Sequence, residues 1–255
     1  MSDLAIVVPV YNEAENVLPM VREVAAAMAH DGRGYELLFV DDGSTDPTWE
    51  RIAQARRDDP RVRGLRHVRN CGQSAALWTG FQATRTPLIA TLDGDLQNDP
   101  AELPRMLALL AEADFVCGRR AHRQDNWSRR LSARVARWAR GMVLRVGFAD
   151  VGCGLRVFKR TVLAGVFGFH GLHRFLPILV AGGGFVTLEV PVRHRPRVAG
   201  VSKYGVWNRL GRGILDLLAV AWYQQRRLQP VATVELGAAC PPTEAASRAP
   251  ATTGA

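Results

Sequence analysis

Short apolar runs alternate with longer amphipathic stretches along the first 118 residues of the chain. The apolar runs have the length of β-strands, and the stretches between them repeat their apolar residues at helical spacing. The predicted strands cover residues 5–10, 35–40, 62–68, 87–92 and 114–118, and the predicted helices cover 13–30, 48–58, 73–84 and 101–112. This order is typical of a mostly parallel sheet covered by helices, so we predict an α/β fold.

A polar cluster accompanies the end of each predicted strand. The clusters are PVYNE (9–13), DDGSTD (41–46), RNCGQ (69–73), DGDLQ (93–97) and GRR (118–120). In open sheets of this class, ligands bind beyond the carboxyl ends of the strands. Asp41 and Asp42 alone could be the cap of the following helix. Five polar clusters at one edge of a sheet, however, predict a binding site.

The segment 91-TLDGDLQNDP-100 carries the most specific spacing. If the strand alternation continues past residue 92, then Asp93, Asp95 and Gln97 point to the same side. Three such oxygen donors suit a hard divalent cation, Mg²⁺ or Mn²⁺. Asp-Gly-Asp is also ordinary turn chemistry, so the spacing alone leaves both interpretations open.

Beyond residue 120 the pattern changes to two basic amphipathic stretches, 127–145 and 206–227. The basic face of the first could be an ordinary solvated helix surface, or it could bind phosphates or face a membrane, whereas the second could pack on the protein's own core or lie at a membrane interface. The stripe of the first is Leu131, Val135, Trp138 and Met142, with Arg130, Arg134 and Arg137 on another face, and the second carries Trp207, Leu210, Ile214 and Leu217. Residues 175–192 contain two prolines and a triple glycine and are predicted to be loop and strand. Residues 228–255 are poor in large apolar residues and are predicted to be a disordered tail.

Composition limits the partners of the protein. A net charge of +9 favours nucleic acid, an anionic membrane or phosphorylated substrates. No stacking-aromatic platform or helix-turn-helix pattern supports nucleic acid. The four cysteines lie far apart, with neither a CxxC pair nor zinc-finger histidine spacing, which argues against a disulfide scaffold or a structural zinc site and fits a reducing cytosol. We find no signal peptide at the start and no apolar run of the roughly 18 to 20 residues that a spanning helix needs.

Taken in order, the motifs resemble the family 2 glycosyltransferases that load sugars onto polyprenyl phosphates, of the dolichol-phosphate mannose synthase and undecaprenyl-phosphate glycosyltransferase types. The resemblance covers about residues 4–225 and rests on PVYNE, DDGSTD, RNCGQSAALWTG (69–80), DGDLQNDP (93–100), DVGCGLRVFKR (150–160) and HRPRVAGVSKYG (194–205). It implies a GT-A catalytic domain over 1–205, followed by the amphipathic helix over 206–227, which could lie at the membrane interface, and by the tail over 228–255 that composition predicts. It also implies a UDP- or GDP-linked sugar donor, Mg²⁺ or Mn²⁺, and inversion at the anomeric carbon.

The resemblance also assigns roles to individual residues. It implies that Asp95, Arg119, Arg197 and Lys203 act in catalysis and that Arg129 or Arg130 meets the acceptor phosphate. The metal ligands would be Asp93, Asp95 and Gln97. The residues implied to contact the nucleotide sugar are Pro9, Tyr11, Glu13, Val40, Asp42, Asp93, Gly94, Asp95, Arg119, Arg197 and Lys203.

The expected enzyme therefore moves one sugar to a polyprenyl phosphate while lying peripherally on the cytoplasmic face of the membrane. Because the acceptor is already a phosphate anion, no general base is needed, and the arginines must hold two anions in line. The amphipathic stretch could also mediate homo-oligomer formation. A first alternative is the same fold with a glycan or a non-prenyl lipid as acceptor. A second is a catalytically dead binding protein, against which the retained DGDLQ, Arg197 and Lys203 argue.

Overall fold

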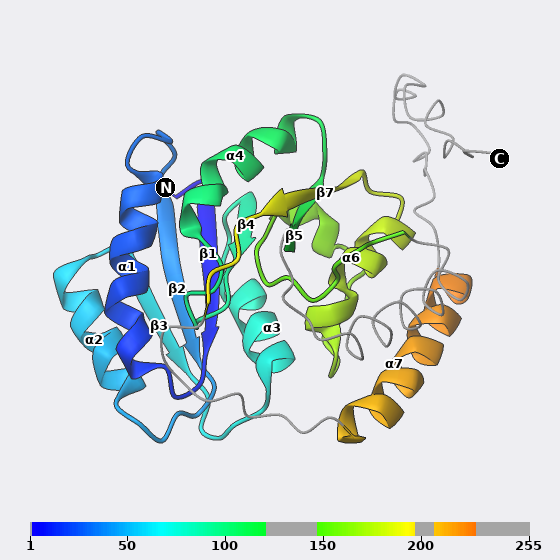
Figure 1. Ribbon diagram of the computed structural model, residues 1–255, viewed down its shortest axis with the longest axis horizontal. Helices are drawn as coiled ribbons and strands as arrows, with labels where there is room; N and C mark the ends of the chain where they lie inside the picture. Colours follow the sequence, from blue (N-terminus) through cyan, green and yellow to red (C-terminus); the bar gives the residue numbers. More distant parts are fainter. Residues whose placement is uncertain (1, 121–146, 197–206, 228–255) are drawn as a thin grey trace, which may run out of the picture.

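The computed structural model describes residues 2–120, 147–196 and 207–227, with the side chains of 207–214 left aside. Seven strands form one mixed sheet in the order β3-β2-β1-β4-β6-β5-β7 (Figure 1). They are β1 Leu4–Val10, β2 Tyr35–Asp41, β3 Val62–Arg66, β4 Leu88–Thr91, β5 Phe115–Arg120, β6 Arg156–Lys159 and β7 Thr187–Val192.

Six of these strands run in one direction. Strands β1 to β4 pair in parallel, and β5 pairs in parallel with β7. Strand β6 is antiparallel to both of its neighbours, β4 and β5, so β5 and β7 point the same way as β1. The carboxyl ends of the six strands therefore lie along one edge of the sheet.

Helices cover both faces of the sheet (Figure 1). Helices α1 Ala14–Met28, α2 Thr48–Asp58 and α4 Leu103–Ala108 pack on one face, and α3 Gln73–Ala83, α6 Leu172–Gly182 and α7 Trp207–Arg226 pack on the other. Three 3₁₀ segments, Pro100–Glu102, Leu109–Ala111 and Arg160–Leu163, complete the described elements. Alternate residues of β1 enter the two cores, with Ile6 and Val8 in one and Val7 in the other, as the strand period of two requires.

The predicted α/β architecture is confirmed, with shifted boundaries. The third strand ends at Arg66 instead of residue 68, and the helix predicted over 101–112 is a short α-helix between two 3₁₀ segments. GRR does not follow the fifth strand, because β5 itself extends to Arg120. Strand β6 has four residues and had not been predicted.

The prediction of loop over the first part of 175–192 is wrong, because helix α6 continues to Gly182. Pro177 stands inside this helix and has no backbone N–H to donate to the carbonyl four residues earlier. That carbonyl belongs to His173 and accepts instead from Arg156 Nη2 at 2.5 Å. A side chain from β6 thus replaces the missing helical hydrogen bond. The strand predicted in the second part of this region is present as β7.

Helix α7 lies where the second amphipathic stretch had been predicted. Its side chains that are described include Leu217, which packs against the core on the α6 face. The stretch 127–145 and the tail 228–255 lie outside the described residues. Among the parts of the chain that the structure describes, no helix combines the length and apolar character that crossing a bilayer requires.

Candidate active site

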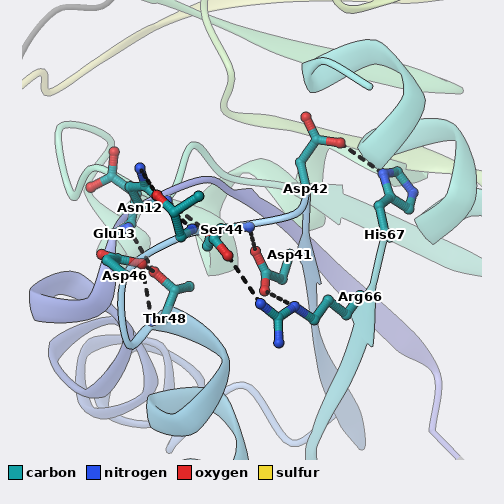
Figure 2. A network of polar contacts seen from close by, with 10 residues as sticks. Asn12, Glu13, Asp41, Asp42, Ser44, Asp46, Thr48, Arg66 and His67 are labelled. Atoms are coloured by element: carbon teal, nitrogen blue, oxygen red, sulfur yellow. Dashed lines mark hydrogen bonds and ion pairs between the residues drawn. The ribbon is translucent and has the colours of Figure 1, made fainter. Parts of the chain in front are cut away.

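Two polar loops meet at the carboxyl edge of β1 and β2 (Figure 2). Asn12 has a φ of 54° and donates its backbone N–H to Ser44 Oγ at 2.9 Å. Its side-chain Oδ1 accepts from the backbone N–H of Thr45 at 2.8 Å. Next to it, the backbone N–H of Glu13 donates to Thr48 Oγ1 at 2.9 Å. These bonds fix the PVYNE segment against DDGSTD, as the shared edge predicted.

Asp41 and Asp42 are adjacent in sequence but have separate partners (Figure 2). Asp41 is fully buried, accepts from the backbone N–H of Ser44 at 2.9 Å, and lies 3.2 Å from Arg66 Nε. Asp42 accepts from the backbone N–H groups of Cys71 and Gly72 at 2.9 and 2.7 Å. Each carboxylate therefore has donors of its own, which offsets the cost of burying two adjacent acids.

Asp42 is also 2.7 Å from His67 Nδ1. Through its contacts with His67, Cys71 and Gly72, Asp42 shapes the loop between β3 and α3. The role expected from the sequence, contact with the base and ribose, did not include this structural function. Pro9 and Val40, which were expected to line the same pocket, are buried and paired in register across β1 and β2.

Asp93 lies in a ring of polar contacts beyond β4. Its two carboxylate oxygens accept from Gln73 Nε2 at 2.8 Å and Asn98 Nδ2 at 3.1 Å. Burial raises the pKa of Asp93, and the negative charge of Asp95 raises it further. A bound cation would relieve both effects, and the all-oxygen donors of this segment fit a hard divalent ion.

The segment that contains Asp93 and Asp95 is a turn and not a continuation of β4. Strand β4 ends at Thr91, and Leu96 has a φ of 59°. A Cβ on Gly94 would lie 2.7 Å from Val10 Cγ1, so the turn packs directly on β1. The alternation used to predict the converging side chains therefore does not extend past this point, although the charges of Asp93 and Asp95 do interact.

Gln97 contacts the segment around Arg195. Its backbone N–H donates to Asp95 Oδ1 at 3.2 Å, and its side-chain amide donates to the carbonyl of Arg195 at 3.4 Å. Arg195 returns a backbone hydrogen bond to the carbonyl of Gln97 at 2.8 Å and forms an ion pair with Asp99 at 2.7 Å. Residue Arg195, which lies two positions before Arg197, is therefore fixed beside the DGDLQ segment. Arg197, Lys203, Arg129 and Arg130 themselves lie outside the described residues.

The loop before β6 packs directly against Asp93. A Cβ on Gly154 would lie 2.2 Å from Asp93 Oδ2, so only glycine allows this approach. Thr91 Oγ1 holds the same residue by donating to the Gly154 carbonyl at 2.6 Å.

Two arginines carry positive charge near the acidic pair. Arg156 is 2% exposed, and burial lowers its pKa. Arg120 donates to Asp150 at 2.7 Å, and this hydrogen bond raises the pKa of Arg120. Both charges lower the pKa of Asp93 and so partly counter its burial. Arg119, which the resemblance had singled out, is exposed on β5.

Several residues of this arrangement had no predicted role. Gln73, Asn98, Gly154 and Arg156 all stand inside motifs that had been recognised, so the motifs did mark them. Their contacts with Asp93 or α6 depend on the pairing of β6 between β4 and β5 and on the docking of α3, which a short motif does not specify.

This fold and this acidic edge define a glycosyltransferase of the GT-A type. The chain belongs to glycosyl transferase family 2, whose model matches residues 5–167. The resemblance stated from the sequence is thus confirmed at the level of the family.

Curated relatives place the chain near enzymes named for polyprenyl phosphates. It is 39% identical over 237 residues to the dodecaprenyl-phosphate galacturonate synthase of Rhizobium johnstonii, which covers 89% of this chain and 69% of the relative. It is 36% identical over 208 residues to the undecaprenyl-phosphate 4-deoxy-4-formamido-L-arabinose transferase of Edwardsiella ictaluri, which covers 80% of this chain but only 63% of that protein. The chain therefore spans about two thirds of the length of these relatives.

Solved structures share the fold at low sequence identity. The mannosyl-3-phosphoglycerate synthase of Rubrobacter xylanophilus matches with a TM-score of 0.63 and 19% identity, over 92% of this chain and 78% of that one. The glucosyl-3-phosphoglycerate synthase of Mycobacterium tuberculosis, solved with Mn²⁺, UDP and phosphoglyceric acid, matches with a TM-score of 0.65 and 20% identity, over 86% of this chain and 78% of that one. These matches confirm the GT-A fold.

Proposed function

We propose that this protein transfers a sugar from a nucleotide-sugar donor to a polyprenyl phosphate at the surface of the cytoplasmic membrane, with inversion at the anomeric carbon. The observation that carries the proposal is the Asp93–Asp95 pair at the carboxyl edge of a GT-A sheet, where Gln73 and Asn98 hold the Asp93 carboxylate. The names of the curated relatives support the acceptor class.

In this proposal Asp93, Asp95 and Gln97 hold Mg²⁺ or Mn²⁺. When bound, the ion neutralises the charge that grows on the departing nucleoside diphosphate. Tyr11, Glu13 and Asp42 would face the nucleoside, together with the backbone around Pro9, Val40 and Gly94. Two solved structures of this fold contain UDP with Mn²⁺ or Mg²⁺, which supports the same donor chemistry here.

Basic residues then have to hold the two anionic reactants. Arg119 reaches solvent from β5, and Arg195, two positions before Arg197 in the sequence, is fixed beside Gln97. We assign Arg119, Arg197 and Lys203 to the donor phosphates and Arg129 or Arg130 to the acceptor phosphate. An acceptor phosphate oxygen attacks without a general base, so alignment of the two anions is the main task of these side chains.

Helix α7 supports a peripheral position on the inner face of the membrane. Its Leu215, Leu218 and Trp222 are 68%, 56% and 65% exposed and lie three and four residues apart on one face. Val220 and Ala221 on the opposite face are buried against the core. An apolar stripe of this kind on a basic protein suits an anionic bilayer surface. The division into a catalytic unit over 1–205, an interface helix over 206–227 and a tail, and the formation of homo-oligomers, belong to the same proposal.

The test is transfer from a panel of radiolabelled UDP- and GDP-sugars to undecaprenyl phosphate in detergent, with Mn²⁺ or with chelator. We expect one donor to give a lipid-linked product, and chelator to abolish its formation. This result would identify the sugar together with the metal requirement.

Two other outcomes separate the alternatives. Metal-dependent hydrolysis of one donor without any lipid product would keep the transferase chemistry and exclude polyprenyl phosphate as the acceptor. Undiminished transfer in chelator would contradict the metal role of Asp93, Asp95 and Gln97.

A further inference from the structure

A second cluster of potential metal ligands lies at the carboxyl ends of β2 and β3. One oxygen of Asp42, one ring nitrogen of His67 and the Cys71 sulfur all lie within 4.8 Å of one another. We propose that these three side chains form a binding site for a thiophilic divalent cation such as Zn²⁺. This site is separate from the acidic pair beyond β4. It was not visible as a zinc motif in the sequence, because Asp42 follows β2 whereas His67 and Cys71 follow β3.

The separations of the three ligand atoms can be compared with those around a bound zinc ion. Zinc bonds of about 2.0 to 2.3 Å to nitrogen, oxygen and sulfur place tetrahedral ligand atoms roughly 3.3 to 3.6 Å apart. In the structure, His67 Nδ1 is 2.7 Å from Asp42 Oδ1. Side-chain shifts of about 1 Å would therefore bring the three atoms to bonding positions around one ion.

The ligands are already oriented by other groups. Asp42 is held by the backbone N–H groups of Cys71 and Gly72 at 2.9 and 2.7 Å. His67 Nε2 lies 2.9 Å from Thr79 Oγ1, which fixes the plane of the ring. A histidine that binds metal through one ring nitrogen usually donates the other N–H to such a partner.

The proton changes can be followed atom by atom. A carboxylate cannot donate, so His67 Nδ1 carries the hydrogen of its 2.7 Å contact with Asp42. When the ion binds to Nδ1, the ring hydrogen moves to Nε2 and is donated to Thr79 Oγ1. The Cys71 thiol releases its proton to solvent and binds as the thiolate.

The donor set also selects the ion. Thiolate and imidazole prefer Zn²⁺ or Co²⁺, whereas Mg²⁺ and Mn²⁺ prefer the oxygen ligands beyond β4. The buried cysteines do not compete, because burial raises the pKa of Cys117 to about 12 and that of Cys153 to about 11. Cys71 is partly exposed, so an ion can reach it. If Asp42 contacts the donor as proposed above, an ion held here would occupy the nucleoside end of the active site.

The experiment is a Co²⁺ titration of the reduced, full-length protein, followed by near-ultraviolet absorption. A thiolate ligand to Co²⁺ gives a charge-transfer band, and oxygen ligands alone do not. We expect one equivalent of Co²⁺ to produce this band and excess Zn²⁺ to remove it. Cys71→Ser should abolish the band and weaken Zn²⁺ binding at least about tenfold, whereas the matched control Cys240→Ser should retain both.

A second measurement needs no variant. Zn²⁺ should protect Cys71 of the wild-type protein from alkylation, as quantified by mass spectrometry of the Cys71 peptide, and Mg²⁺ should not. The proposal is overturned if the Co²⁺ band is absent, if it survives in Cys71→Ser, or if Zn²⁺ leaves the alkylation rate unchanged. None of these readouts depends on sugar transfer, so they can fail or succeed independently of the proposed function.

Discussion

At the scale of single residues, the charge of Asp95 is expected to lower the stability of the protein when no metal is bound. Burial and the Asp95 carboxylate both raise the pKa of Asp93. A carboxyl group whose pKa is raised by folding contributes most stability below its unfolded pKa, and this contribution is lost as the pH rises through its folded pKa. Once the pH is above the raised pKa of Asp93, the repulsion between its carboxylate and that of Asp95 opposes folding until a cation binds.

We expect Asp95→Asn to separate stability from activity. Without metal at neutral pH, the unfolding temperature should equal or exceed that of the wild type, because one repelling charge is gone. Sugar transfer should fall about 100-fold or more, a loss typical of removing one group that stabilises transition-state charge. Scanning fluorimetry in chelator and in Mn²⁺, with the exposed Asp58→Asn as control, measures the first effect. Normal turnover or a large drop in unfolding temperature would contradict the assignment.

At the scale of secondary-structure elements, the contact of the loop before β6 with the end of β4 forms the back of the site. Gly154 has no room for a side chain, since a Cβ would lie 2.2 Å from Asp93 Oδ2. Gly154→Ala should therefore displace Asp93, lower transfer activity, and cost about 1 to 3 kcal/mol of unfolding free energy, the usual range for overpacking. Gly147→Ala is the matched control, because a Cβ there meets nothing within 4 Å. Urea denaturation and transfer assays of the two variants should differ clearly, and equal behaviour would show that the loop gives way.

The same elements show what the sequence could and could not predict. The strands and their polar ends follow from a period of two and from turn residues, and these local signals also located Asp42, Asp93 and Asp95. Helix α6 was not predicted, because Pro177 and the glycines are local breaking signals. Residues from elsewhere in the chain supply hydrogen bonds that compensate for these breaking signals. Arg156 donates to the His173 carbonyl, and Ser74 Oγ accepts from the Gly171 N–H at 3.1 Å. Contacts between distant segments of this kind override local preference.

At the scale of the whole molecule, the proposed membrane contact rests on the net charge of +9 together with the exposed stripe on α7. Neither is sufficient alone, because a few exposed apolar side chains bind a bilayer weakly and basic residues add only about 1 kcal/mol each near anionic lipid. Binding to vesicles should therefore require both an anionic lipid and the three apolar residues Leu215, Leu218 and Trp222.

We expect the double variant Leu215→Ser, Trp222→Ser to lose most of its cosedimentation with phosphatidylglycerol vesicles while its unfolding temperature stays unchanged, because both side chains are exposed. Val186→Ser is the matched control, since this exposed apolar residue lies outside α7. Raising the salt concentration should weaken binding of the wild type by screening its basic charges. If the double variant binds as well as the wild type, the apolar side chains of α7 do not contribute and charge alone attracts the protein to the membrane. If the wild type binds equally well to neutral vesicles, its basic charge does not contribute.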